Sequence, residues 1–116
     1  TNQFMSEAMQ DVNIPKNAFF SSNMPYELDK VRVHESNEKR FKRIHELFSN
    51  TRKLDGTLLI KALCDHDVDD KPSGNTVCRH FPLFHTTASA ILFPKRKRAY
   101  FLIGSPCKNK FHKYTF

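Results

Sequence analysis

The stretch Thr86–Ile103, TTASAILFPKRKRAYFLI, decides the fold because two apolar runs meet there across a short basic turn. The first run, Thr86–Phe93, is rich in β-branched and small residues, and the second, Ala99–Ile103, is apolar at every position. Pro94 ends the first run, since proline has no N–H to give to a sheet. The pattern predicts an antiparallel hairpin. Because both alternating faces are apolar, it also predicts that other elements cover the hairpin on both sides.

Two helices are predicted upstream of the hairpin. The first runs from an N-cap at Ser36 to about Asn50 and carries its apolar side chains on one arc: Phe41, Ile44, Leu47 and Phe48. The second is shorter and begins at a cap formed by Asp55 or Thr57. The residues that it offers for burial are Leu58, Leu59, Ala62 and Leu63.

The remaining segments are predicted to be mostly irregular. Residues 6–35 show no helical or strand periodicity of apolar residues, so we predict a long surface loop, which we call the surface excursion, with one helical turn near 6–10. Residues 64–84 are polar and interrupted by proline and glycine, so we expect a loop with one short strand near 76–79 at most. The tail after Cys107 alternates basic and aromatic residues.

Length and charge limit the function classes. With 116 residues the chain is one domain or part of one. The net charge of +7 favours anionic partners such as nucleic acid, acyl-coenzyme A or an acidic subunit. No apolar run approaches the roughly 20 residues of a membrane span, so no membrane association is predicted. Three cysteines cannot all pair within the chain and no N-glycosylation acceptor is present, which favours an intracellular setting.

Arg40 is the residue that local physics singles out. It falls within the apolar arc of the first predicted helix, where a guanidinium costs several kcal/mol unless polar groups meet it. Two interpretations follow: a buried structural ion pair, or a charged group held in a functional site.

Metal sites are not predicted from the spacing. Cys64 with His66 and Cys78 with His80 form two C-x-H pairs, whereas zinc motifs usually separate two ligands by two to five residues within one turn. The acidic run 65–70, DHDVDD, lacks the glycine and terminal glutamate of an EF-hand loop. We therefore expect no metal and no cofactor.

Other chemistries remain open as alternatives. The basic run PKRKR at 94–98 and the basic-aromatic tail could contact nucleic acid, although a solvated turn and a packed terminus explain them equally well. Cys78 and His80 could form a nucleophile and base, but residues two apart in a strand rarely reach each other in the required geometry. A structural subunit that only completes another chain's sheet is a third alternative.

Six stretches, taken in order, resemble one enzyme family. They are TNQF at 1–4, SNEKRFKRIHELF at 36–48, LCDHD at 63–67, VCRH at 77–80, TTASAILF at 86–93 and GSPCKNKFHKY at 104–114. The chain resembles the C-terminal part of the isopenicillin N acyltransferase (acyl-coenzyme A:6-aminopenicillanic acid acyltransferase) family of N-terminal-nucleophile hydrolases. The resemblance covers nearly the whole chain, so residues 1–116 are interpreted as a single partial domain.

The resemblance implies an α+β class, as part of a four-layer αββα fold with a central antiparallel hairpin and two flanking helices. It also implies a precursor that cuts itself to expose an N-terminal Cys, whose thiol forms an acyl-thioester with an amide or acyl-coenzyme A substrate. Within this resemblance Asn2 supplies an oxyanion donor, and Arg40 is a charged orienting group near the nucleophile. Arg79 is a weaker candidate for the same neighbourhood.

The chain also departs from the family pattern. No residue corresponds to the nucleophilic Cys, so the expected partner is the upstream part of the same precursor. Gln3 stands where many relatives have His, which bears on the groups supporting Asn2. Thr1 as a freshly exposed nucleophile is the other interpretation. The resemblance disfavours it, because it places Thr1 and Asn2 on the oxyanion motif.

Overall fold

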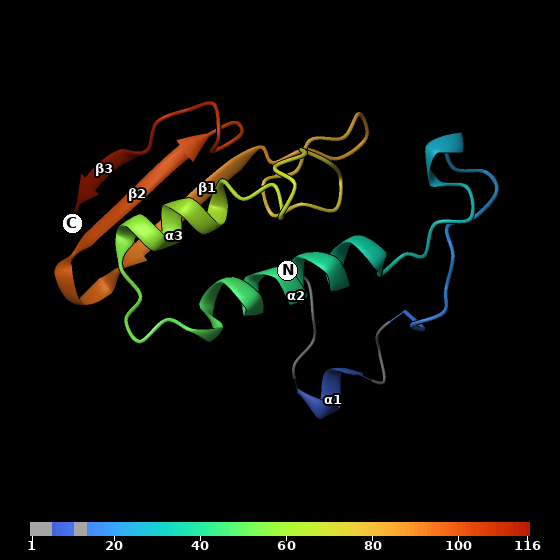
Figure 1. Ribbon diagram of the computed structural model, residues 1–116, viewed down its shortest axis with the longest axis horizontal. Helices are drawn as coiled ribbons and strands as arrows, with labels where there is room; N and C mark the ends of the chain where they lie inside the picture. The colour runs from blue at the N-terminus through green and yellow to red at the C-terminus, as the bar shows by residue number, and fades with distance from the viewer. Residues whose placement is uncertain (1–5, 11–13) are drawn as a thin grey trace.

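The computed structural model describes residues 6–10 and 14–116. Its elements follow in the order α1 (Glu7–Gln10), η1 (Tyr26–Leu28), α2 (Glu35–Ser49), α3 (Gly56–Leu63), β1 (Ala88–Phe93), η2 (Pro94–Arg96), β2 (Arg98–Ile103) and β3 (His112–Thr115). The strands form one antiparallel sheet in the order β1-β2-β3 (Figure 1). The chain is thus of the α+β class. No helix in the described part is both long and apolar enough to cross a membrane.

The predicted hairpin is confirmed. β1 starts two residues later than expected and β2 one residue earlier, with Ile91 paired to Tyr100 across the two strands. Pro94 stops β1 as predicted and opens the one-turn helix η2. Lys97 then adopts a left-handed conformation with φ of 48°, which reverses the chain into β2. The basic run is therefore the exposed turn of the hairpin.

The tail forms a third strand that the sequence did not predict. β3 pairs with β2 so that Tyr114 lies opposite Ala99. Gly104 ends β2 with φ of +92°, and a Cβ built there would lie 2.8 Å from the Asn109 Nδ2 atom. A side chain at this position would therefore be strained both in its backbone and against its neighbour. The short strand expected near 76–79 is absent, and only an isolated bridge joins His80 to His85.

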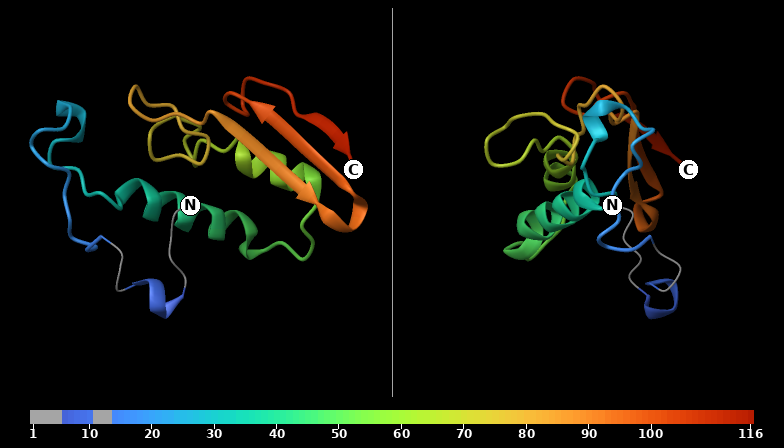
Figure 2. Two further views of the ribbon diagram at one scale, coloured as in Figure 1. Left: turned by 180° about the vertical axis from the view of Figure 1, so that it is seen from behind. Right: turned by 90° about the vertical axis from the view of Figure 1, so that its right-hand side faces the viewer.

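Only one face of the sheet is covered by this part of the chain. α2 and α3 lie on the same side of the sheet (Figure 2). A Cβ at Gly56, the first residue of α3, would lie 3.5 Å from the Phe93 ring, so the helix packs directly on β1. The core on this face is formed by Ala62 of α3 together with Ile91 and Leu102, which are 5% or less exposed.

The prediction that other elements cover the hairpin on both sides is wrong for the described residues. Neighbouring side chains of a strand point to opposite faces, and the face away from α3 carries Leu92, Phe101 and Ile103, which are 59%, 44% and 82% exposed. Tyr114 and Phe116 extend this surface and are also exposed. We call these five residues the open sheet face.

The two predicted helices are confirmed, and only the first starts differently from the prediction. α2 begins at Glu35 and has His34 at its N-cap without a side-chain hydrogen bond. Ser36 is not the cap, because its hydroxyl donates to the Gly74 carbonyl at 2.7 Å. In α3 the prediction holds, since the Asp55 carboxylate accepts the Leu58 N–H at 2.8 Å.

A bidentate ion pair joins α2 to the loop after α3. Arg43 donates two hydrogen bonds to the Asp65 carboxylate, at 2.8 and 3.0 Å, which tie the helix to the loop after α3. Its predicted apolar arc is only partly buried, and the one buried residue of the helix is Asn37. The radius of gyration is 16.1 Å, against about 13 Å for a compact domain of this length. The molecule is therefore more extended than a compact domain of the same length.

Candidate functional site

A cavity of about 580 Å³ lies where three segments meet. Its walls come from the excursion before α2, from the first half of α2, and from the loop 73–84. Apolar side chains line part of the cavity, including Phe20, Leu28 and Phe81. None of these three segments could form the cavity alone, so the site depends on the tertiary fold.

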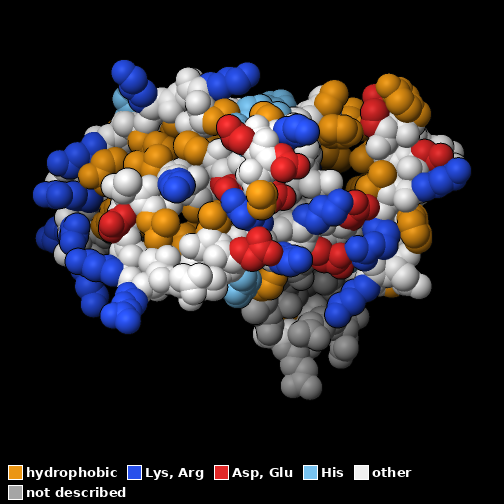
Figure 3. All heavy atoms as spheres, viewed as in Figure 1, with side chains coloured by type: hydrophobic (Ala, Val, Ile, Leu, Met, Phe, Trp, Pro, Cys, Tyr) orange, Lys and Arg blue, Asp and Glu red, His pale blue; other side chains and the backbone are white. Residues whose placement is uncertain are grey.

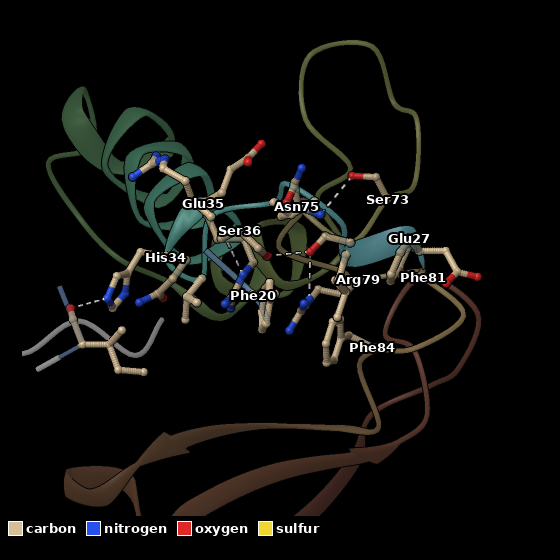
Figure 4. Close-up of a pocket in the computed structure, with 18 residues that line it drawn as sticks. Phe20, Glu27, His34, Glu35, Ser36, Ser73, Asn75, Arg79, Phe81 and Phe84 are labelled. Carbon is tan, nitrogen blue, oxygen red and sulfur yellow. Dashed lines mark hydrogen bonds between the residues drawn. The ribbon is translucent and has the colours of Figure 1, made fainter. Parts of the chain in front are cut away.

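Ser36 and Arg79 converge on one backbone oxygen at the edge of this cavity (Figure 4). The Gly74 carbonyl accepts the Ser36 hydroxyl at 2.7 Å and the Arg79 Nε–H at 2.9 Å. The Arg79 guanidinium also lies 5.0 Å from the centre of the Phe84 ring, a cation–π distance. These contacts hold Arg79 in one orientation and join the loop to the start of α2.

Arg40 lies in the same cavity. Its Nε–H donates to the Ser36 carbonyl at 3.2 Å, one helical turn earlier. Burial lowers the pKa of Arg40, and the nearby charge of Arg79 lowers it further. Burial also lowers the pKa of Arg79. Both side chains remain charged at neutral pH, because the guanidinium group of arginine stays protonated in proteins.

The guanidinium groups of Arg40 and Arg79 place two positive charges at the cavity. Within residues 6–10 and 14–116, neither Arg40 nor Arg79 forms a salt bridge, whereas Arg32 at the same cavity is paired with Glu38. Neither guanidinium is paired with a carboxylate of the described residues, so both can attract an anion, although Glu27 and Glu35 also line this cavity. The cavity can therefore hold a carboxylate, a phosphate or a developing oxyanion beside an apolar wall.

The structure brings together some of the predicted site residues. Arg40 and Arg79, which the family resemblance assigned to the same neighbourhood, both line one cavity. Asn2 and Thr1 lie outside the described residues. The sequence did not indicate Ser36 and Gly74 as partners, because Ser36 was read as a helix cap. The one sequence feature that could have indicated this contact is Gly74, because a glycine in a loop allows another backbone to approach closely.

The expectation that Cys78 and His80 do not reach each other is wrong. The Cys78 Sγ atom lies 3.3 Å from the His80 Nε2 atom, because residues 76–80 do not form a regular strand. Burial nevertheless raises the pKa of Cys78 to about 11, so the thiol is protonated at neutral pH. A protonated thiol is a poor nucleophile, and neither residue lines the cavity.

Potential metal ligands gather at a separate place. Among the residues that the structure describes, His66, Cys78, His80 and Cys107 form a group of four, all outside the cavity lining. Cys64, which the sequence paired with His66, is not in this group.

Comparisons with known proteins add no assignment, since no family model, curated protein or solved structure matches this chain.

Proposed function

We propose that this chain is the C-terminal part of an N-terminal-nucleophile amidohydrolase or acyltransferase that resembles isopenicillin N acyltransferase and acts on C–N amide bonds. The nucleophile is an N-terminal Cys on the upstream part of the precursor. Its thiol loses a proton to its own α-amine and attacks the amide carbonyl carbon. The C–S bond forms, the C–N bond breaks, and the amine leaves with that proton. Water or a second amine then cleaves the thioester.

The observation that carries this proposal is the one-sided sheet. A helix covers one face of β1 and β2, and the other face exposes a continuous set of apolar side chains. An αββα sandwich consists of two such halves, with the apolar faces of two sheets packed against each other. The open sheet face is therefore the surface on which a second sheet from the upstream part would pack.

The cavity supports the same proposal. Attack on an amide carbonyl creates a negative oxygen, and hydrogen-bond donors aimed at that oxygen stabilise it. We assign Arg40 to orienting and charge stabilisation near the nucleophile, with Arg79 beside it. By the family resemblance, Asn2 donates to the oxyanion through its side-chain amide. The apolar wall suits the acyl group of a small-molecule amide or acyl-coenzyme A.

Activity of the joined parts tests the proposal. The chain is co-expressed with the segment encoded upstream of residue 1, and amine release is measured from fluorogenic N-acyl-aminocoumarin amides of different acyl length. Mass spectrometry then looks for an acyl-thioester. We expect Asn2→Ala to lower kcat about 100-fold, the cost typical of losing one oxyanion donor. Arg40→Met should lower kcat/KM at least about tenfold.

Arg52→Met is the matched control, because Arg52 is exposed and lies outside the cavity. It should leave kcat/KM unchanged. Full activity of Asn2→Ala would remove the oxyanion assignment, and the absence of any amide cleavage or thioester by the joined parts would overturn the proposal.

The open sheet face can be tested separately. Ile103→Lys places a charge on a residue that is 82% exposed in this chain. It should leave the chain folded and prevent its association with the upstream part, measured by co-purification. Unchanged association would contradict the packing of a second sheet on this face.

A second candidate function is that of a small basic nucleic-acid-binding module. Lys and Arg side chains gather at the end of the molecule that carries the hairpin turn (Figure 3), and the exposed turn holds Lys95, Arg96, Lys97 and Arg98. Phosphate contacts would produce a steep fall of affinity with salt. Binding to DNA and RNA measured across salt concentrations separates the two functions, and no binding at low salt removes this one.

A further inference from the structure

Three segments far apart in the sequence place metal-ligating side chains at one point. His66 follows α3, Cys78 and His80 lie in the loop before β1, and Cys107 lies in the turn between β2 and β3. Their four ligand atoms all lie within 4.8 Å of one another. The His80 Nε2 atom is 3.3 Å from the His66 Nε2 atom, 3.3 Å from the Cys78 Sγ atom and 3.2 Å from the Cys107 Sγ atom.

The three separations that meet at His80 are close to the edges of a zinc-centred tetrahedron. Zinc binds imidazole nitrogen at about 2.0–2.1 Å and thiolate sulfur at about 2.3 Å in tetrahedral geometry. Those bond lengths place two nitrogen ligands about 3.3 Å apart and a nitrogen and a sulfur about 3.6 Å apart. The three distances at His80 are within a few tenths of an ångström of these values. The other three pairs of ligand atoms lie within 4.8 Å of each other, so the side chains close by at most about 1 Å to meet one ion.

The geometry points to a structural Zn²⁺ site formed by His66, Cys78, His80 and Cys107. Zn²⁺ displaces the thiol protons when it binds. Two thiolates and two imidazoles are a common ligand set of structural zinc, and four protein ligands leave no open position for substrate. The inference does not depend on the proposed enzymatic function. It replaces the expectation of no metal, which considered only pairs close in sequence.

The surroundings of the ligands fit this role. Cys78 is fully buried, and the His66 side chain is 12% exposed. The His66 Nδ1 atom lies 3.1 Å from the Asp70 carboxylate, so a carboxylate orients the ring whose Nε2 atom faces the cluster. The backbone N–H of Cys78 donates to the Asp65 carbonyl, which joins two of the ligand-bearing segments.

A metal here would hold together the long loop between α3 and β1. Residues 64–87 contain no helix or strand among the named elements, yet they carry Gly74 and Arg79 of the cavity. The described chain buries few apolar residues, and small cores of this kind are often completed by a structural metal. Zinc would fasten this loop to the β2–β3 turn.

The experiment uses the full chain purified under reducing conditions. Elemental analysis should find one zinc per chain. Replacement by Co²⁺ should give the visible bands of tetrahedral, thiolate-ligated cobalt. Cys107→Ser changes an exposed ligand and should fold, lose stoichiometric zinc and lose the cobalt bands. Asp70→Asn should retain the ion and weaken its binding about tenfold.

Cys64→Ser is the matched control, because Cys64 lies beside the same loop but outside the cluster. It should bind one zinc with an unchanged cobalt spectrum. A chelator should lower the unfolding midpoint of the wild type and of Cys64→Ser, but not that of Cys107→Ser. Folded wild type without bound zinc, a Cys78–Cys107 disulfide in the reduced preparation, or full zinc binding by Cys107→Ser would each overturn the inference.

Discussion

The ion pair between Arg43 of α2 and Asp65 of the loop after α3 provides the sharpest test of how α2 is held in place. Arg43→Met removes both hydrogen bonds to the Asp65 carboxylate and keeps an unbranched apolar side chain in place of the arginine stem. Asp65 then retains only the backbone N–H of Asp67, which it accepts at 2.9 Å. Burial alone would raise the pKa of Asp65, yet its bonds with Arg43 bring the net shift below the ordinary value. The substitution therefore leaves a partly buried charge without its main partner.

The expected loss in the free energy of unfolding lies between the values for an exposed and for a buried ion pair. Exposed ion pairs contribute about 0.2–1 kcal/mol, and breaking a buried pair costs about 3–5 kcal/mol. The side chains of Arg43 and Asp65 are 19% and 11% exposed, and the pair is bidentate. We expect a loss of about 2 kcal/mol in the free energy of unfolding. With a urea m-value of about 1.5 kcal/mol/M, the midpoint falls by about 1.3 M.

Urea unfolding of the full chain, followed by circular dichroism, measures this loss. Lys42→Met is the matched control, because Lys42 is 81% exposed and lies 3.8 Å from its carboxylate partner. It should cost less than about 0.5 kcal/mol. A double-mutant cycle with Asp65→Asn should give a coupling energy of about 2 kcal/mol. Equal midpoints for Arg43→Met and Lys42→Met, or a coupling near zero, would refute the reasoning.

Three further predictions address the sheet and the start of α2. Leu102→Ala, at a residue 2% exposed, should lower the unfolding free energy by about 3 kcal/mol, whereas Ile103→Ala should change it by less than about 0.5 kcal/mol in the same urea titration. Gly104→Ala should cost more than about 1 kcal/mol, because φ is +92° there; an unchanged thermal midpoint would contradict this. The hydrogen bond from Arg32 lowers the pKa of Glu38, so the stabilisation is present above its ordinary value of 4.5 and is lost as pH falls through the lowered value. Unfolding free energies measured against pH should show this loss in the wild type and not in Glu38→Gln.

The sequence determined the elements whose signals are local. Two apolar runs separated by Pro94 and a basic turn are enough to specify a hairpin, because proline has no N–H to give to the sheet. Asp55 capped α3 as expected, since the capping bond spans only three residues. The presence of Arg40 on an apolar arc also marked a charge that needed an explanation.

Tertiary structure decided which faces are covered and which side chains meet. Helix periodicity could not show that both helices lie on one side of the sheet, so the open sheet face was not foreseen. Nor could spacing bring His66 and Cys107 to the same point as Cys78 and His80, because their proximity depends on how three loops fold back. Local physics sets secondary structure and caps, whereas contacts between distant segments exist only after the chain has packed.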